Sequence, residues 1–276
     1  MRSGLTITVT LLVTAMIMSL PATSANAARC GNTGAGFKTW LADFKKRARA
    51  RGVSARTISS ALNGITYNRR IIRLDRNQRT FKQSFARFYK RRASPGLMRT
   101  ARRKMKRHAR TLRRVEKRYG VPPAVIVTIW GMETNFGRGS GKMNIIRSLA
   151  TLAYDCRRSK FFTNELMSAM RIIDRGDMRP SQMRGGWAGE IGQAQFLASS
   201  YLNYAVDFDG NGRRDLIRST SDVLGSIGNF LKRHGWRRGQ PWGPGTRNYA
   251  VLRDWNRATV YRRTIAKASG ILANRR

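Results

Sequence analysis

A carboxylate, Glu133, directly follows the apolar run AVIVTIWGM at residues 124–132. Proline is tolerated in the first turn of a helix, so the two prolines before this run can open one. Helical spacing then puts Glu133 on one face with Ile129 and Phe136. An ionised carboxylate is costly to bury, so desolvation should raise its pKa and keep it protonated as a general acid near neutral pH. A buried ion pair with one of the many arginines would give the same pattern.

A second chemical pattern runs from residue 207 to residue 222. Its oxygen ligands would be Asp207, Asp209, Asn211, Arg213 through its backbone carbonyl, and Asp222. Ligands at positions 1, 3 and 5, followed by glycine at position 6, are typical of the first half of an EF-hand loop. Position 12 is Arg218, which cannot ligate, so Asp222 is the substitute. We expect weak Ca²⁺ binding here. The alternative is an Asx-rich turn whose oxygens cap backbone amides.

The two cysteines, Cys30 and Cys156, are the next pair with chemical meaning. An even number of cysteines in an exported chain favours a disulfide. The bridge would close a loop of about 125 residues and contribute about 4–5 kcal/mol in the chain-entropy description. Two separate thiols are the alternative.

The elements that must hold these groups are predicted to be almost entirely helical. Apolar residues recur at helical spacing over residues 37–44, 81–88 and 105–119, and we interpret His108 as a packed core histidine. No segment has a convincing strand period. Residues 240–247, rich in glycine and proline, predict a loop before a last helix. The predicted fold class is mostly α, with a single domain over residues 28–276.

The first 27 residues have the layout of a secretory signal peptide. A positive start is followed by an apolar run over residues 5–20 and by the small-x-small site Ala25-Asn26-Ala27. An uncleaved membrane anchor is the alternative, because the run is near the lower limit for a span. A lipid anchor on Cys30 is disfavoured, since Arg29 stands where a lipobox has Gly or Ala. We therefore expect a soluble, exported protein.

The net charge is +41, from 55 Lys and Arg against 14 Asp and Glu. Such a field attracts polyanions and anionic surfaces. For an exported chain, murein carboxylates, anionic envelope polymers and lipid head groups are better partners than nucleic acid. We expect no specific nucleic-acid role.

Several segments, in order along the chain, resemble the lytic transglycosylases of the membrane-bound transglycosylase B family. They are WGMETNFG (residues 130–137), RSLATLAYDCRR (147–158), GGWAGEIGQAQF (185–196), SSYLNYAVDFDGNGRRDL (199–216) and NFLKRHGW (229–236). The resemblance covers nearly all of the chain after residue 27.

The resemblance implies a lysozyme-like helical catalytic domain that cleaves the β-1,4 bond between N-acetylmuramic acid and N-acetylglucosamine. Glu133 would protonate the glycosidic oxygen and then take the proton of the muramoyl C6 hydroxyl as it attacks C1, leaving a 1,6-anhydromuramoyl end. The chemistry would need no cofactor. The family also carries an EF-hand-like Ca²⁺ site in the segment 207–222.

The resemblance also implies a set of substrate-binding residues: Gln195, Tyr261, Phe230, Gly186, Trp187 and Asn256. Three positions depart from the family pattern. Gly186 stands where a serine is usual, Phe230 replaces a tyrosine, and Ala258 replaces a serine. Glu190 stands where many members have alanine, and we interpret it as a structural partner of an arginine.

We therefore predict a monomeric, periplasmic lytic transglycosylase acting on peptidoglycan glycan strands. Two rivals remain. The departures at Gly186, Phe230 and Ala258 would suit a catalytically weak murein or polyanion binder. A second cleft carboxylate at Glu190 would suit a hydrolytic muramidase that uses water.

Overall fold

The computed structural model describes residues 30–77 and 83–274, and the expected signal peptide at residues 1–27 lies outside them. The predicted mostly helical fold is confirmed. The helices are α1 (Phe37–Ala50), α2 (Ala55–Leu62), α3 (Arg69–Arg76), α4 (Phe85–Arg92), α5 (Pro95–Arg107), α6 (Ala109–Tyr119), α7 (Pro123–Thr134), α8 (Ile145–Tyr154), α9 (Ser159–Asp174), α10 (Ala198–Tyr204), α11 (Thr220–Arg233), α12 (Arg247–Trp255) and α13 (Thr259–Ala273). No helix among these is long and apolar enough to cross a membrane.

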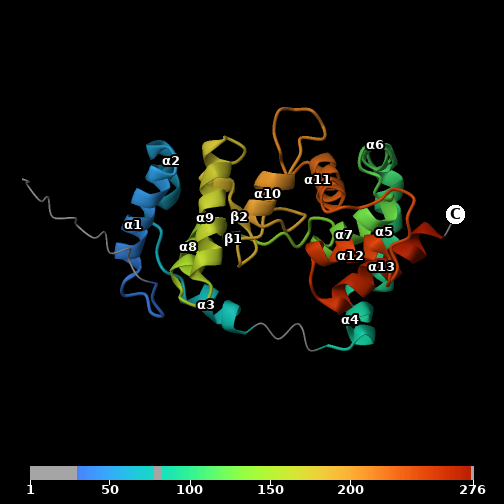
Figure 1. Cartoon of the computed structure of the whole chain (residues 1–276), viewed down its shortest axis with the longest axis horizontal. Coiled ribbons are helices and arrows are strands. Elements are labelled where there is room, and N and C mark those ends of the chain that lie inside the picture. The colour runs from blue at the N-terminus through green and yellow to red at the C-terminus, as the bar shows by residue number, and fades with distance from the viewer. Residues whose placement is uncertain (1–29, 78–82, 275–276) are drawn as a thin grey trace, which may run out of the picture.

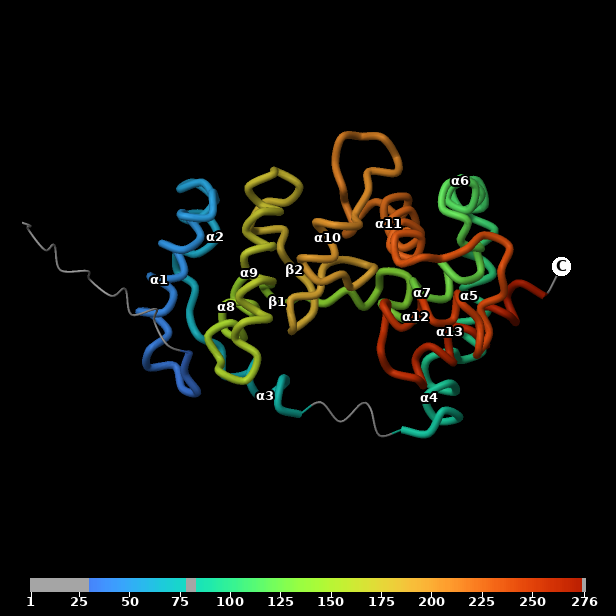
Figure 2. Tube along the Cα trace, viewed as in Figure 1, coloured from blue at the N-terminus to red at the C-terminus, as the bar shows by residue number. Residues whose placement is uncertain are grey.

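The molecule is elongated, with helices gathered at its two ends (Figure 1). Helices α1, α2, α8 and α9 form one end, where α8 packs along α9. Helices α4 to α7 and α11 to α13 form the other, where α7 packs against both α13 and α5. The trace in Figure 2 shows α10 and the short strands lying between the two ends.

Helix α7 lies at the centre of the core. Every residue from Ala124 to Met132 is buried, so the helix is apolar on all sides and has no solvent face. It ends at Asn135, which takes the left-handed conformation with φ of 49°. The predicted single face through Phe136 is therefore wrong, because Phe136 lies beyond the helix end. Its ring instead meets the edge of Trp130, with 5.2 Å between centroids.

The predicted stripe over residues 105–119 is broken into two helices. Serine caps and proline explain the start of α5, since the Ser94 hydroxyl accepts from the Leu97 N–H and Pro95 occupies the first turn. The chain bends at His108, between α5 and α6. His108 is half-buried, and its ring lies edge-on to Trp130. The break lets α6 pack on α11 while α5 stays against α7.

The predicted disulfide between Cys30 and Cys156 is present and ties the segment before α1 to the end of α8. An ion-pair cluster lies beside it. Arg76 pairs with Asp155 at 2.8 Å, and the buried Asp75 accepts from Arg157 and Arg158. Together these links hold α1 and α3 onto the α8–α9 pair.

Two strands are present that the sequence does not predict. Strand β1 (Met143–Asn144) pairs antiparallel with β2 (Arg184–Gly185). Each has two residues, which is too short to produce an alternating pattern. Gly185 also bridges to Ile191, and Ile191 to Phe196, so residues 185–196 fold back on themselves.

Candidate active site

Glu133 is the last residue but one of α7, and its side chain is half-buried. Its Oε1 atom accepts two hydrogen bonds, from Trp255 Nε1 at 2.8 Å and from Tyr261 Oη at 2.5 Å. Both donors come from residues more than a hundred positions further along the chain. The carboxyl group is therefore fixed by side chains of α12 and α13.

A break between α12 and α13 orients Trp255 and Tyr261 toward Glu133. The predicted single last helix is wrong: α12 ends at Trp255, and α13 begins at Thr259. Between them the Asn256 Oδ1 atom accepts from the Ala258 N–H at 2.9 Å and holds the turn. Because α13 packs along α7, Tyr261 in its first turn meets Glu133.

Burial raises the pKa of Glu133 above its usual value. The hydrogen bonds from Tyr261 and Trp255 and the charge of Arg92 work in the opposite direction, and the charge of Glu190 adds to the rise. Burial also raises the pKa of Tyr261 well above its usual value, so its hydroxyl stays protonated and donates. No ion pair of the described residues includes Glu133. The geometry therefore favours a protonated acid over the alternative of a buried ion pair with an arginine.

A cavity of about 370 Å³ opens beside Glu133. The predicted residues that line it with Glu133 are Gln195, Phe230 and Asn256. Glu190, Ser200, Asp254 and Trp255 complete its polar lining. Tyr261 is buried and reaches the site through Glu133. The described lining does not include Gly186 or Trp187; Trp187 packs, half-buried, against the core.

Gln195 has a backbone conformation that non-glycine residues rarely adopt, with φ of 51°. Its Nε2 atom donates to the Gly192 carbonyl at 2.8 Å and to the Ser140 carbonyl at 3.2 Å. In the described chain, the other non-glycine residues with positive φ are Asn135 and Phe136, directly after Glu133. Such strain collects at functional sites, and here it surrounds one carboxyl group.

The sequence reasoning missed Gln193, a buried residue that joins three segments at the site. Its Oε1 accepts from Trp130 Nε1 at 2.9 Å, and its Nε2 donates to the Ile217 carbonyl at 2.9 Å. Its own carbonyl accepts from Thr134 Oγ1 at 2.8 Å. The network ties the end of α7 to the segment before α11. Trp255 was also missed as a donor, because nothing local in the sequence shows that the end of α12 lies against Glu133.

Glu190 has no arginine partner in an ion pair within the described chain, which contradicts its interpretation as a structural pair. Its Oε2 atom instead accepts from the Ala188 N–H at 3.0 Å. Burial raises its pKa. Gly186 lies directly against it, because a Cβ atom added there would come within 2.1 Å of Glu190 Oε2.

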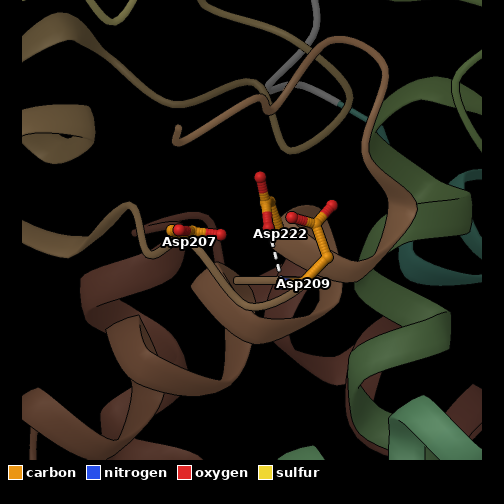
Figure 3. Close-up of side chains that lie close together, drawn as sticks. All are labelled: Asp207, Asp209 and Asp222. Carbon is orange, nitrogen blue, oxygen red and sulfur yellow. Dashed lines mark hydrogen bonds between the residues drawn. The ribbon is translucent and has the colours of Figure 1, made fainter. Parts of the chain in front are cut away.

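The carboxylates of Asp207, Asp209 and Asp222 converge, with one oxygen of each within 4.8 Å of the others (Figure 3). Asp222 is fully buried and accepts from the N–H groups of Phe208, Asp209 and Asp215. Asp207 accepts from three further N–H groups of the loop.

The other two predicted ligands lie in the same loop, where the Asn211 N–H donates to Asp207 at 3.1 Å and to Asp209 at 3.2 Å. The Asn211 Oδ1 atom accepts from the Arg213 N–H at 2.9 Å, and both residues are exposed. The loop thus combines an acidic cluster with the amide-capping pattern that was the alternative to a Ca²⁺ site.

Comparison with known proteins gives the context of this site. The transglycosylase SLT domain family matches residues 36–246. Membrane-bound lytic murein transglycosylase B of Escherichia coli (strain K12) is 42% identical over 129 residues, which are 46% of this chain and 36% of that protein. The matched region therefore spans about a third of the length of that relative.

The fold matches solved structures over most of the chain. SltB3 from Pseudomonas aeruginosa, solved in complex with NAG-NAM-pentapeptide, is 30% identical with a TM-score of 0.83 over 89% of this chain and 81% of its own. The Escherichia coli lytic transglycosylase Slt35, solved in complex with calcium, is 24% identical with a TM-score of 0.78 over 91% and 97%. The expected lysozyme-like fold is confirmed, and the chain belongs to the transglycosylase SLT domain family.

Proposed function

We propose that this protein is a lytic transglycosylase of peptidoglycan, which cleaves the β-1,4 bond between N-acetylmuramic acid and N-acetylglucosamine without water. The observation that carries the proposal is Glu133, a carboxyl group of raised pKa beside a cavity, with one oxygen fixed by Trp255 and Tyr261. Family membership supports the same reaction class.

In the first step Glu133 acts as the general acid. Because Oε1 accepts two hydrogen bonds, the acidic proton belongs on Oε2. Oε2 gives this proton to the glycosidic oxygen, and the bond from that oxygen to C1 of the muramoyl residue breaks. The N-acetylglucosamine part leaves with a new hydroxyl, and C1 becomes oxocarbenium-like. The donors on Oε1 then stabilise the carboxylate that the transfer leaves behind.

In the second step the same carboxylate acts as the base. It takes the proton of the muramoyl C6 hydroxyl while that oxygen bonds to C1, which closes a 1,6-anhydro ring. Glu133 ends the cycle protonated, so no second acid, no water and no cofactor is consumed. The neighbouring acetamido group of the sugar can stabilise C1, as in substrate-assisted glycosidases.

The remaining site residues bind the sugar. Gln195 keeps its Oε1 atom for the substrate, because its Nε2 donates to two carbonyls. An acceptor there suits a hydroxyl or an acetamido N–H. Phe230 offers an apolar wall in place of a tyrosine hydroxyl. Asn256 borders the cavity at its turn, and Gly186 and Trp187 act through the loop that carries Glu190.

The loop at 207–222 is proposed to bind Ca²⁺ weakly. Carboxylate oxygens are the ligands Ca²⁺ prefers, and Asp207, Asp209 and Asp222 supply them within a small space. The Slt35 protein was solved in complex with calcium. The Asn211 side chain would have to turn toward the ion, since its oxygen now accepts the Arg213 N–H, and the Arg213 carbonyl would be a further ligand. That cost, and the arginine at position 12, are the reasons for expecting low affinity.

Location and partners follow from the sequence. We propose removal of residues 1–27 on export, a single catalytic domain over residues 28–276, and a monomer in the periplasm. Removal of residues 1–27 takes away Arg2 and leaves a net charge of 41 − 1 = +40, which would hold the protein on anionic murein, envelope polymers or lipid surfaces. Mass spectrometry of the mature protein tests this cleavage, because it should begin at Ala28.

The reaction is tested by digesting purified murein sacculi and identifying the released ends by mass spectrometry, with Glu133→Gln in parallel. Anhydromuramoyl ends that disappear in the variant are expected. A hydrolytic muramidase is the second candidate, because Glu190 lines the same cavity as Glu133. Reducing muramoyl ends would favour it. Binding to sacculi with no released product would make this protein a murein binder and overturn the proposal.

A further inference from the structure

Two departures from the family sequence pattern, Gly186 and Glu190, meet at one place in the cleft. The Glu190 carboxyl group lines the cavity that Glu133 lines. Its Oε2 atom accepts from the Ala188 N–H at 3.0 Å, which fixes the group in the cavity wall. A Cβ atom on residue 186 would lie 2.1 Å from Oε2 and 2.9 Å from the carboxyl carbon. Glycine at 186 is therefore what makes room for the carboxyl group.

The Glu190 carboxyl group lowers the stability of the folded protein by its position in the cleft. Burial raises the pKa of Glu190, and Arg158, whose charge acts on it in the opposite direction, is already paired with Asp75. A carboxylate that is shielded from water and has no ion pair lowers the free energy of unfolding, so its presence calls for a functional reason. One such reason is an effect on Glu133, because the charge of Glu190 raises the pKa of Glu133.

Resting on the proposed function, we propose that Glu190 is a second functional carboxylate of the cleft: it acts on Glu133 across the cavity that both residues line, and it accepts a hydrogen bond from a hydroxyl or acetamido N–H of the glycan. Two carboxyl groups in one cavity titrate as a pair, so the first to ionise makes the second keep its proton to higher pH. Backbone N–H groups stabilise the charge of Glu190, and this charge raises the pKa of Glu133.

The other charged groups around Glu133 act differently. Arg92 on α4 favours its ionised form, and Tyr261 on α13 and Trp255 on α12 do so by hydrogen bonds. Arg138 borders a second cavity that Glu133 also lines, and Asp254 lines the first cavity and is exposed. Glu190 is thus the half-buried negative charge of the described cleft whose effect on the pKa of Glu133 opposes these groups.

The charge is tested with Glu190→Gln, which keeps the size and an acceptor oxygen but cannot ionise. On soluble uncrosslinked glycan strands, the alkaline limb of the kcat/KM pH profile, where activity falls, should move to lower pH by about half a unit or more. KM should stay within about twofold of the wild-type value, because the hydrogen bond is retained. Asp254→Asn is the matched control, and its limb should stay in place because its charge lies in water. An unmoved limb in Glu190→Gln would overturn the proposal.

The hydrogen bond is tested with Glu190→Ala, which should show the same limb shift and a KM about tenfold higher. Gly186→Ala should reproduce this phenotype, because its new methyl group displaces the carboxyl group. Added to Glu190→Ala, the same substitution should change little further. If the effects of Gly186→Ala and Glu190→Ala on KM and on the limb simply add, Gly186 supports the loop conformation independently of Glu190. A melting temperature of Glu190→Gln equal to or above that of the wild type would rule out a purely structural role.

The outcome stays separate from the test of the proposed function. If the wild-type protein releases no anhydromuramoyl ends, the proposed function fails. The glycan contact of Glu190 is then measured by titrating the N-acetylglucosamine tetramer, followed by tryptophan fluorescence. Binding about tenfold weaker in Glu190→Ala would support the contact, and equal binding would refute it.

Discussion

Glu133 and Asp222 are both carboxyl groups whose pKa is raised by burial, yet their hydrogen bonds differ. Asp222 lies at the start of α11 and has backbone N–H donors on both oxygens. Glu133 lies at the end of α7 and has side-chain donors on one oxygen only. Because both oxygens of Asp222 accept backbone N–H groups, this carboxyl group has a structural role. An oxygen left for a cavity lets Glu133 give up a proton.

This comparison predicts that Glu133→Gln destroys activity while Asp222 variants damage folding. Glutamine can still accept from Trp255 and Tyr261 but cannot give a proton. Initial rates on sacculi should fall by about 10²–10⁴-fold, the usual range for loss of a general acid–base group. A variant that retains wild-type rates would remove Glu133 from the mechanism.

The same variant should be more stable than the wild type at neutral pH. The folded pKa of Glu133 lies above its unfolded value, so the folded state binds more protons between the two values. Wild-type stability contributed by this group is therefore present below about pH 4.3 and lost as pH rises through the folded pKa. Urea unfolding of both proteins at pH 4 and pH 7 measures the difference, which should grow with pH.

Asp222→Ala should lower the free energy of unfolding by about 3–5 kcal/mol, because it leaves buried N–H donors of the loop without an acceptor. Asp209→Ala is the matched control, since Asp209 is exposed and should change stability little. Urea titration followed by tryptophan fluorescence gives both values. A loss no larger in Asp222→Ala than in Asp209→Ala would contradict its role as the scaffold carboxylate.

Tyr261→Phe should lower kcat by about tenfold, because one donor to the ionised Glu133 is lost. That hydrogen bond lowers the pKa of Glu133, so its removal should raise this pKa and move the alkaline limb of kcat/KM to higher pH. This shift is opposite in sign to the one expected for Glu190→Gln. A shift in the same direction for both variants would show that charge and hydrogen bonding are wrongly assigned.

The smallest effect is expected from Ca²⁺. Millimolar Ca²⁺ should raise the melting temperature by a few degrees in the wild type, by mass action on the folded state. Asp207→Asn should abolish the rise without changing the rate on sacculi at saturating substrate. An unchanged wild-type melting temperature would leave the loop as a turn whose oxygens cap backbone amides.

The sequence predicts Glu133, its helix and the disulfide because each depends on local composition or on a simple pairing. It does not predict that α7 is buried on all sides, since an apolar run fits a one-sided or a fully buried helix equally well. The turn at Asn256 that aims Trp255 and Tyr261 at Glu133 depends on contacts across more than a hundred residues. Gln193 is hidden because its partners lie on two other segments, α7 and the chain at Ile217.

Digestion of sacculi in H₂¹⁸O tests the central claim most directly. If Glu133 passes the proton of the C6 hydroxyl and no water enters, the released muramoyl ends should have the mass of the anhydro form and carry no ¹⁸O. Muramoyl ends that carry one ¹⁸O atom, and that disappear in Glu133→Gln, would show that the same acid works with water and would contradict the transglycosylase account.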